Sequence, residues 1–244
     1  MIHAIASNKA GHSFKVSEIN WRSLFAASED SLTSSVFGKL FYLPSDLLLR
    51  ILNEACYSNG LPAATSRLEG YEFWPKWNAG GTKNSRHVEP DVFIRFAEFD
   101  IIVEAKRFDN NQQSNAQWEG EVRAYLNEFY TADKPVYLLA VGGITTETEE
   151  IIKVKGRVIK VIKCRWSRLL RQVQHIQSQL EYSKGILSAN DAMINILADL
   201  VTVFRLHGYA TGKWLEDLTY YKINHPVTNY NNILKTFNPR EWKL

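Results

Sequence analysis

Two carboxylates and a lysine are the residues of this chain best suited to catalysis. They are Asp91, Glu104 and Lys106, within the stretch EPDVFIRFAEFDIIVEAKRF. Two carboxylates held side by side repel each other unless a positive charge lies between them, and a divalent cation is the simplest candidate. Carboxylate oxygens are ligands that Mg²⁺ and Mn²⁺ prefer, and Mg²⁺ also binds the phosphate oxygens of a substrate.

A lysine beside such a pair has a use in the same reaction. Lys106 could orient or help to deprotonate an attacking water, or stabilise charge that builds on a phosphate. The residue types together therefore predict metal-assisted hydrolysis of a phosphodiester.

The two apolar runs that carry these residues have the composition of β-strands. If they form a hairpin that turns at Ala97 and Glu98, Asp91 lies opposite Glu104, and alternation puts Lys106 on the same face. The other face of this hairpin is then wholly apolar, with Val92, Ile94, Phe96, Ile101, Val103 and Ala105.

The spacing also resembles a known family. Pro90-Asp91, twelve intervening residues and then Glu104-Ala105-Lys106 resemble the PD-(D/E)xK nuclease superfamily, which has the restriction-endonuclease-like fold. The resemblance covers about residues 29–165 and includes the order of the elements. It implies that Asp91 and Glu104 bind a metal ion and that Lys106 assists the water.

The resemblance extends to the flanking helices. It implies a metal-proximal acid on the leading helix, for which Glu29 is the best match and Asp30 the second. The family's following helix often begins with Gln and carries Tyr four residues later, whereas Gln117 is followed at that spacing by Glu121. The predicted metal-binding residues are Asp91, Glu104, Ala105 and Glu29, and the predicted catalytic residues are Asp91, Glu104, Lys106, Glu29 and Gln117.

Structural interpretations of the same residues stay open. Asp91 could begin a strand beside a loop and pair with Lys106, while Glu104 faces solvent on an edge. Acids at a helix start, such as Glu29 and Asp30, interact favourably with the helix dipole without any further role. A solvated helix face is the commoner explanation for acids such as Glu121.

A basic segment predicts contacts with nucleic acid. Residues 151–180 contain no acid, and alternation along KVKGRVIK places several cations on one strand face. A track along a phosphate backbone is one interpretation, and a solvated surface balanced by acids elsewhere is the other. The predicted DNA-binding residues are Arg86, from the polar loop before the site, and Lys153, Lys155, Arg157, Lys160 and Lys163.

The periodicity predicts an α/β fold. Helices are expected near residues 29–42, 46–57, 114–131, 167–180 and 191–207, with a short one in TTETEEII, and strands at 67–77, 91–97, 100–107, 135–141 and 157–164. With the resemblance, this indicates a restriction-endonuclease-like core, a central mixed sheet flanked by helices. The expected domains are a nuclease-like domain over 1–184 and a C-terminal helical extension over 185–244 that packs on the core.

Composition sets the broad class. The 244 residues are 45% hydrophobic and 23% charged, enough to bury a substantial core, and the net charge of +3 permits a polyanionic partner. The two cysteines, Cys56 and Cys164, fit a reducing cytosol. No apolar run approaches a membrane span and the N-terminus lacks a signal peptide's apolar core, so we expect a cytoplasmic protein without membrane contact.

The sequence therefore predicts a nuclease that depends on Mg²⁺ or Mn²⁺ and acts on DNA. The segment SEDSLTSSVFGKLFYLP resembles the N-terminus of certain nucleases of prokaryotic defence against phage, which implies an antiviral role. The alternative is a non-catalytic nuclease-fold module that binds DNA or serves as a scaffold subunit in a larger defence, repair or transposition complex. The apolar stripe of the helix at 191–207 is expected to close the domain, form a homodimer interface or dock a partner. A homodimer and protein partner subunits are further expectations.

Overall fold

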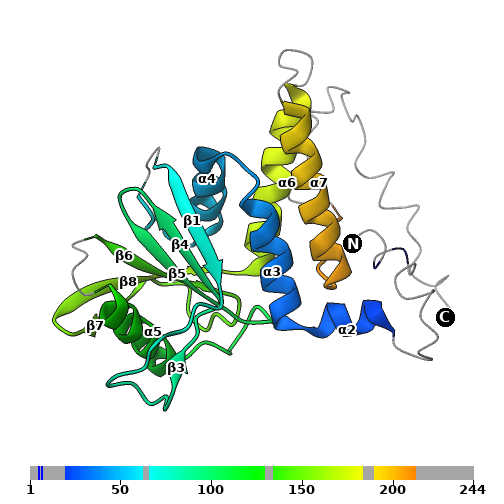
Figure 1. Ribbon diagram of the computed structural model, residues 1–244. Coiled ribbons are helices and arrows are strands. Elements are labelled where there is room, and N and C mark those ends of the chain that lie inside the picture. Colours follow the sequence, from blue (N-terminus) through cyan, green and yellow to red (C-terminus); the bar gives the residue numbers. More distant parts are fainter. Residues whose placement is uncertain are drawn as a thin grey trace, which may run out of the picture. The chain divides into compact units, whose positions relative to one another are not determined.

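Figure 1 shows the computed structural model, which describes residues 20–62, 66–129, 134–183 and 190–212, together with residues 5 and 7. The chain divides into two units, Met1–Thr211 and Gly212–Leu244, and the sheet and its helices belong to the first.

A six-stranded mixed sheet forms the centre of this unit, with strand order β1-β4-β5-β6-β8-β7. Strands β1, β4 and β5 are antiparallel neighbours, β5, β6 and β8 are parallel, and β7 runs antiparallel to β8. The strands are β1 (Leu68–Phe73), β4 (Val92–Phe96), β5 (Asp100–Ala105), β6 (Val136–Val141), β7 (Glu150–Val154) and β8 (Arg157–Cys164). The short strands β2 (Trp77–Asn78) and β3 (His87–Val88) pair separately.

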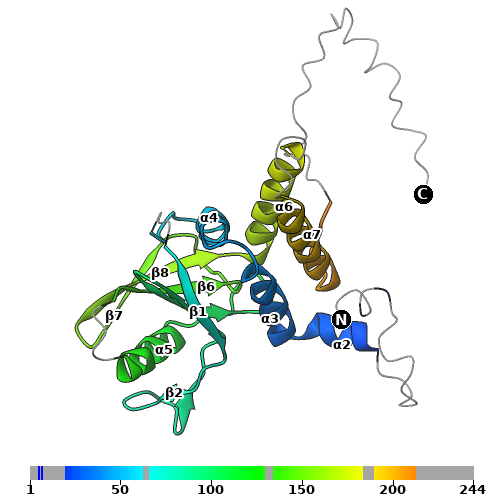
Figure 2. The same ribbon diagram turned by 45° about the horizontal axis from the view of Figure 1, so that its top comes forward.

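Helices cover both faces of the sheet (Figures 1 and 2). Helix α5 packs on one face, and α3, α4, α6 and α7 share a core with the other. The helices are α2 (Trp21–Ala27), α3 (Glu29–Leu40), α4 (Ser45–Ala55), α5 (Asn115–Glu128), α6 (Trp166–Tyr182) and α7 (Asn190–Leu206). The fold is thus α/β, with a mixed sheet between helical layers. Within the described residues, no helix combines the length and apolar character that a membrane span needs.

The β4–β5 hairpin has the predicted register. Val92 pairs with Val103, and Ile94 pairs with Ile101. All six residues of the predicted apolar face are fully buried in the core beneath α3, α4, α6 and α7. On the opposite face, Phe93 and Ile102 are buried against α5. Both faces are therefore covered. Arg95, Glu98 and Asp100 lie at the turn end of the hairpin, and Asp91, Glu104 and Lys106 lie at its open end.

The short helix expected at residues 145–152 is absent, and this prediction is wrong. Residues from Glu150 onward form β7, which pairs with β8 around a two-residue turn at Lys155 (φ +51°) and Gly156 (φ +78°). Positive φ at both central residues is the geometry of a type I′ hairpin turn. The turn geometry and the β-branched residues of β7 favour a strand more strongly than the acidic residues favour the start of a helix.

Helix α7 belongs to the first unit. Its apolar side chains Leu197, Leu200, Val203 and Phe204 are fully buried in the same core as α3 and α6. Much of the extension predicted over 185–244, including all of residues 213–244, lies outside the described residues.

Candidate active site

Asp91 lies beside Glu104 at the open end of the β4–β5 hairpin, opposite its turn. Asp91 directly precedes β4, and its Oδ2 accepts a hydrogen bond of 2.8 Å from the backbone N–H of Ala105. The side chain of Asp91 thereby replaces a backbone acceptor at the point where the backbone hydrogen bonds between β4 and β5 end. The carboxylate of Asp91 is consequently held over the last residues of β5 and is only 9% exposed.

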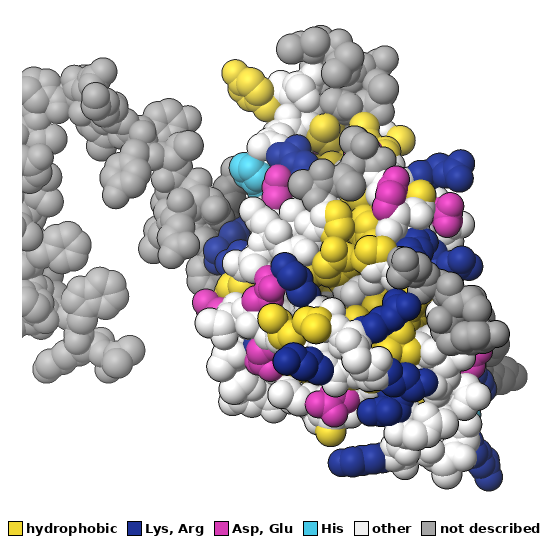
Figure 3. All heavy atoms as spheres, turned by 90° about the vertical axis from the view of Figure 1, so that its left-hand side faces the viewer, with side chains coloured by type: hydrophobic (Ala, Val, Ile, Leu, Met, Phe, Trp, Pro, Cys, Tyr) yellow, Lys and Arg dark blue, Asp and Glu magenta, His cyan; other side chains and the backbone are white. Residues whose placement is uncertain are grey.

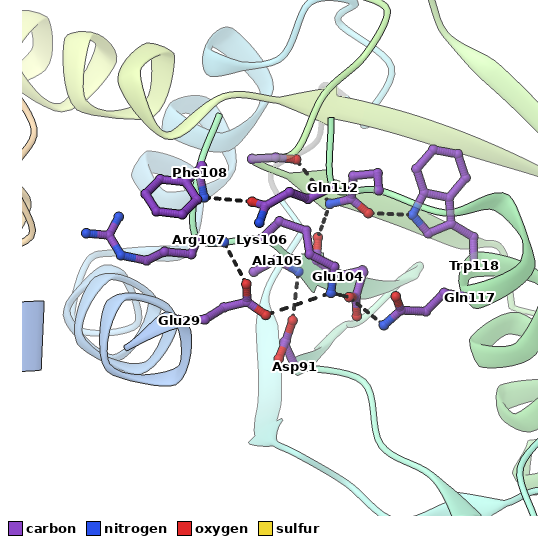
Figure 4. A network of polar contacts seen from close by, with 12 residues as sticks. Glu29, Asp91, Glu104, Ala105, Lys106, Arg107, Phe108, Gln112, Gln117 and Trp118 are labelled. Atoms are coloured by element: carbon purple, nitrogen blue, oxygen red, sulfur yellow. Dashed lines mark hydrogen bonds and ion pairs between the residues drawn. The ribbon is translucent and has the colours of Figure 1, made fainter. Parts of the chain in front are cut away.

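Glu104 is the centre of the polar network in Figure 4. Its side chain is 2% exposed, so the alternative in which it faces solvent on a sheet edge is wrong. Its Oε1 accepts a hydrogen bond of 2.6 Å from Nε2 of Gln117, and the same oxygen forms an ion pair with Nζ of Lys106. Glu104 in β5 and Lys106, which directly follows this strand, thus lie on one side, as alternation requires.

The leading helix brings Glu29 to the same place. Glu29 is the first residue of α3, which begins after the N-cap Ser28. Oε2 of Glu29 accepts the backbone N–H of Arg107 at 2.7 Å, and Oε1 lies 3.8 Å from Nζ of Lys106. The side chain of Asp30, the second candidate, makes no hydrogen bond or ion pair with this network among the described residues.

Gln113, which sequence reasoning missed, positions the start of α5. Its Nε2 donates to the carbonyl oxygens of Glu104 and Gly142, both at 3.1 Å, and its Oε1 accepts from Nε1 of Trp118 at 2.7 Å. These bonds tie the ends of β5 and β6 to α5 and bring Gln117 onto Glu104. Gln113 precedes the helix and follows no periodic pattern, so the sequence carries no signal for this role.

Glu121 is buried in the site, and the expectation that it lies on a solvated face is wrong. Its side chain is 2% exposed and lies beside Glu104, while its Oε2 has no hydrogen-bond partner in the described part of the chain. Burial, and then the negative charge of Glu104, raise the pKa of Glu121 well above its ordinary value. The helical spacing of four from Gln117 could have found it, because such residues share a face.

The electrostatics of the cluster reflect an excess of acids over cations. Burial, followed by the charge of Glu104, raises the pKa of Asp91 to about 7. Burial lowers the pKa of Lys106, but the charges of Glu104, Glu29 and Asp91 outweigh it and raise that pKa overall. Lys106 is therefore an ammonium at neutral pH, and it is the only basic side chain that pairs with these acids among the described residues.

The donor set suits a hard divalent cation. No group of three or more His, Cys, Asp or Glu side chains within the described residues is arranged to hold a metal ion. Asp91 and Glu104 supply two carboxylates, and Ala105 has only its backbone carbonyl oxygen to offer. Mg²⁺ commonly takes one or two carboxylates and completes its shell with water and phosphate. Burial and the negative charge of Glu104 raise the pKa of both Asp91 and Glu121, and such a cation would offset that charge.

The predicted DNA-binding residues are not gathered at this site. Lys155 contacts Asn127 near the C-terminal end of α5, whereas Gln117 lies near its N-terminal end, about 15 Å away along the helix. Figure 3 views the left-hand side of Figure 1, where the β7–β8 hairpin lies, and shows Lys and Arg side chains dispersed among acidic and hydrophobic ones. Lys153, Lys155 and Lys160 are exposed on this hairpin, Arg157 is half-buried there, and Arg86 is exposed on the loop between β2 and β3.

Lys163 is buried, unlike the other cations of the basic segment. Its side chain is 3% exposed, and its Nζ donates to the backbone oxygen of Thr146 at 3.1 Å and forms an ion pair with Glu150. Lys163 therefore does not belong to an exposed basic track. Lys160 pairs with Glu149 at 3.5 Å, so part of the basic segment is balanced by acids that precede it in the chain.

Comparison with known proteins adds one relative. No family model matches this chain. The chain is similar to an uncharacterized protein of Pasteurella multocida (strain Pm70), with 28% identity over 236 residues, which is 90% of this chain and 83% of that protein.

Proposed function

We propose that this chain is a metal-dependent nuclease of the PD-(D/E)xK type with a restriction-endonuclease-like core, and that it hydrolyses phosphodiester bonds in DNA. The observation that carries the proposal is the convergence of Asp91, Glu104 and Lys106 at the end of the β4–β5 hairpin. Glu29 from the preceding helix and Gln117 from the following helix reach the same point. The choice of DNA, and a role in defence against phage, are drawn from the sequence resemblance.

The residues have distinct roles in this proposal. Asp91, Glu104 and the carbonyl of Ala105 would hold a Mg²⁺ or Mn²⁺ ion, with Glu29 nearby. Such an ion would supply Lewis-acid chemistry at the phosphate and at the attacking water. Lys106 acts as a hydrogen-bond donor to the water or the phosphate, because its raised pKa keeps it protonated. Gln117 orients Glu104 through its hydrogen bond.

A second candidate is a non-catalytic nuclease-fold module that binds DNA or a partner subunit. One observation favours it: the amine of Lys106 is engaged by Glu104 and approached by Glu29, an arrangement that could serve structure alone. Such a cluster would stabilise the open end of the β4–β5 hairpin without a metal ion.

Cleavage assays test the nuclease proposal. Supercoiled plasmid, single-stranded DNA and RNA are incubated with Mg²⁺ or Mn²⁺ and the wild type, Asp91→Ala or Lys106→Ala. Each substitution should lower the cleavage rate by about 100-fold or more, because Asp91→Ala removes a proposed metal ligand and Lys106→Ala removes a donor that stabilises charge in the transition state. Arg50→Ala is the matched control, because Arg50 is exposed on α4 and pairs with Glu54. Equal cutting by all four proteins would show that the activity lies elsewhere.

Calorimetric titration with Mn²⁺ separates the two candidates. Binding that disappears in Asp91→Ala supports the nuclease. If the folded wild type binds no Mn²⁺, with or without DNA, the module is favoured instead.

A further inference from the structure

A pocket of about 280 Å³ opens beside the candidate site. It lies between α5 and the loop that joins β2 to β3, and it shares Gln117 and Glu121 with the site. Its walls include Lys83, Val88, Ala116, Gln117, Gly120 and Glu121. This volume is near the lower end of the range for ligand pockets, so it suits a single small unit of a larger substrate.

Glu121 gives the pocket an unused hydrogen-bond acceptor. The side chain is 2% exposed, and its Oε2 has no partner within the described residues. A buried polar atom without a partner costs about 1–3 kcal/mol, so such atoms usually have a ligand or a water to meet. The ligand that fits this oxygen presents an N–H or NH₂ group.

Gly120 keeps space open in the pocket wall. Glycine in a helix interior costs about 1 kcal/mol relative to alanine. A Cβ added at Gly120 would meet nothing within 4 Å, so packing inside the protein does not require a glycine here. The space next to Gly120 is part of the pocket.

Lys83 gives the pocket a cation. It is exposed, and it makes no hydrogen bond or ion pair with any other described residue. Val88 and Ala116 contribute apolar surface to the walls. A nucleotide offers a counterpart to each feature: a phosphate for the ammonium, a flat ring for the apolar walls, and ring or amino N–H groups for the acceptor.

We infer that this pocket is a subsite for one nucleotide of the substrate beside the scissile phosphodiester. The base donates a hydrogen bond to Oε2 of Glu121, and its phosphate lies at Lys83. The inference rests on the proposed function, because it assumes that the adjoining site acts on nucleic acid.

The test measures nucleotide binding without catalysis. The four deoxynucleoside monophosphates are titrated in EDTA into the wild type, Gly120→Leu and Gly38→Leu, and binding is followed by NMR. The wild type should bind at least one of them at millimolar concentrations, and Gly120→Leu should weaken that binding by about tenfold or more, equivalent to about 1.4 kcal/mol. Gly38→Leu is the matched control, because Gly38 lies in α3, away from the pocket, and a Cβ there also meets nothing within 4 Å.

Both leucine variants should fold, since each gains helix propensity. The absence of nucleotide binding by the wild type, or equal binding by Gly120→Leu, would overturn the subsite. If nucleotide binding depends on Gly120 but the protein does not cleave nucleic acid, the subsite is supported and only the proposed nuclease activity is contradicted. If cleavage requires Lys106 but the KM of Gly120→Leu equals that of the wild type, only the subsite is contradicted.

Discussion

Asp91 combines a structural and a chemical task in one side chain. It accepts the N–H of Ala105 at the end of the hairpin, and it lies in the field of Glu104. Burial and that field raise its pKa from 3.8 to about 7. The folded protein therefore keeps a proton on Asp91 that the unfolded chain releases, so the stability that this group contributes falls as the pH rises from about 4 to about 7.

Asp91→Asn should consequently stabilise the protein in the absence of divalent cations. The gain in the free energy of unfolding should be close to zero at pH 4 and should reach at most about 4 kcal/mol at pH 8, since each pKa unit corresponds to about 1.4 kcal/mol. Urea unfolding in EDTA at the two pH values measures it. Asp46→Asn, at an exposed position in the first turn of α4, is the control and should show no such gain. An equal change in stability at both pH values in Asp91→Asn would show that the pKa of Asp91 is not raised in the folded protein.

Two lysines of β8 differ in environment although both pair with a glutamate. Lys163 is 3% exposed and reaches Glu150 and two oxygens of Thr146, whereas the side chain of Lys160 is 52% exposed and pairs with Glu149. The bend before β7 folds over Lys163, and so the ammonium holds the hairpin to its preceding loop.

Lys163→Met should lower the free energy of unfolding by about 1–3 kcal/mol, because it leaves buried acceptors without their donor. Lys160→Met should change it by less than about 1 kcal/mol, as is usual for an exposed ion pair. Urea denaturation of the two variants compares them directly. If Lys160→Met is as costly as Lys163→Met, the buried pair is not what secures the β7–β8 hairpin.

At the scale of the whole molecule, α7 completes the core that supports the site. Leu197, Leu200, Val203 and Phe204 are fully buried, and burial of such side chains contributes about 1.5–3 kcal/mol each. Their sum is comparable with the total stability of a typical domain. The residue after α7, His207, also accepts a hydrogen bond of 2.6 Å from Arg107, whose backbone N–H binds Glu29.

A chain that ends at residue 212 should therefore keep a cooperative unfolding transition, because the first unit ends at Thr211. A chain that ends at residue 184, the predicted domain boundary, should lack that transition and aggregate. Circular dichroism melting and gel filtration distinguish the two outcomes. Cooperative unfolding of the shorter chain would instead place the boundary where the sequence predicted it.

The sequence by itself determined the local periodicities and the pairing and burial that depend on them. Alternation along the β4–β5 hairpin fixed its register, buried Val92 and Val103 on one face, and brought Asp91, Glu104 and Lys106 together on the other. The helical repeat located the principal helices to within a few residues. These features depend on near neighbours in the chain, whose geometry has a fixed period.

Tertiary structure alone decided which polar residues are buried and what they contact. Glu121 shares a helix face with Gln117, but its spacing does not show that it is 2% exposed beside Glu104. Lys163 lies in a basic segment, yet it is 3% exposed beneath the loop before β7. Gln113 joins the ends of β5 and β6 to α5, and α7 closes the core across more than a hundred residues of chain. Burial and such bridging contacts depend on segments far apart in the sequence. The residue pattern within one segment does not indicate which other segments will pack over it.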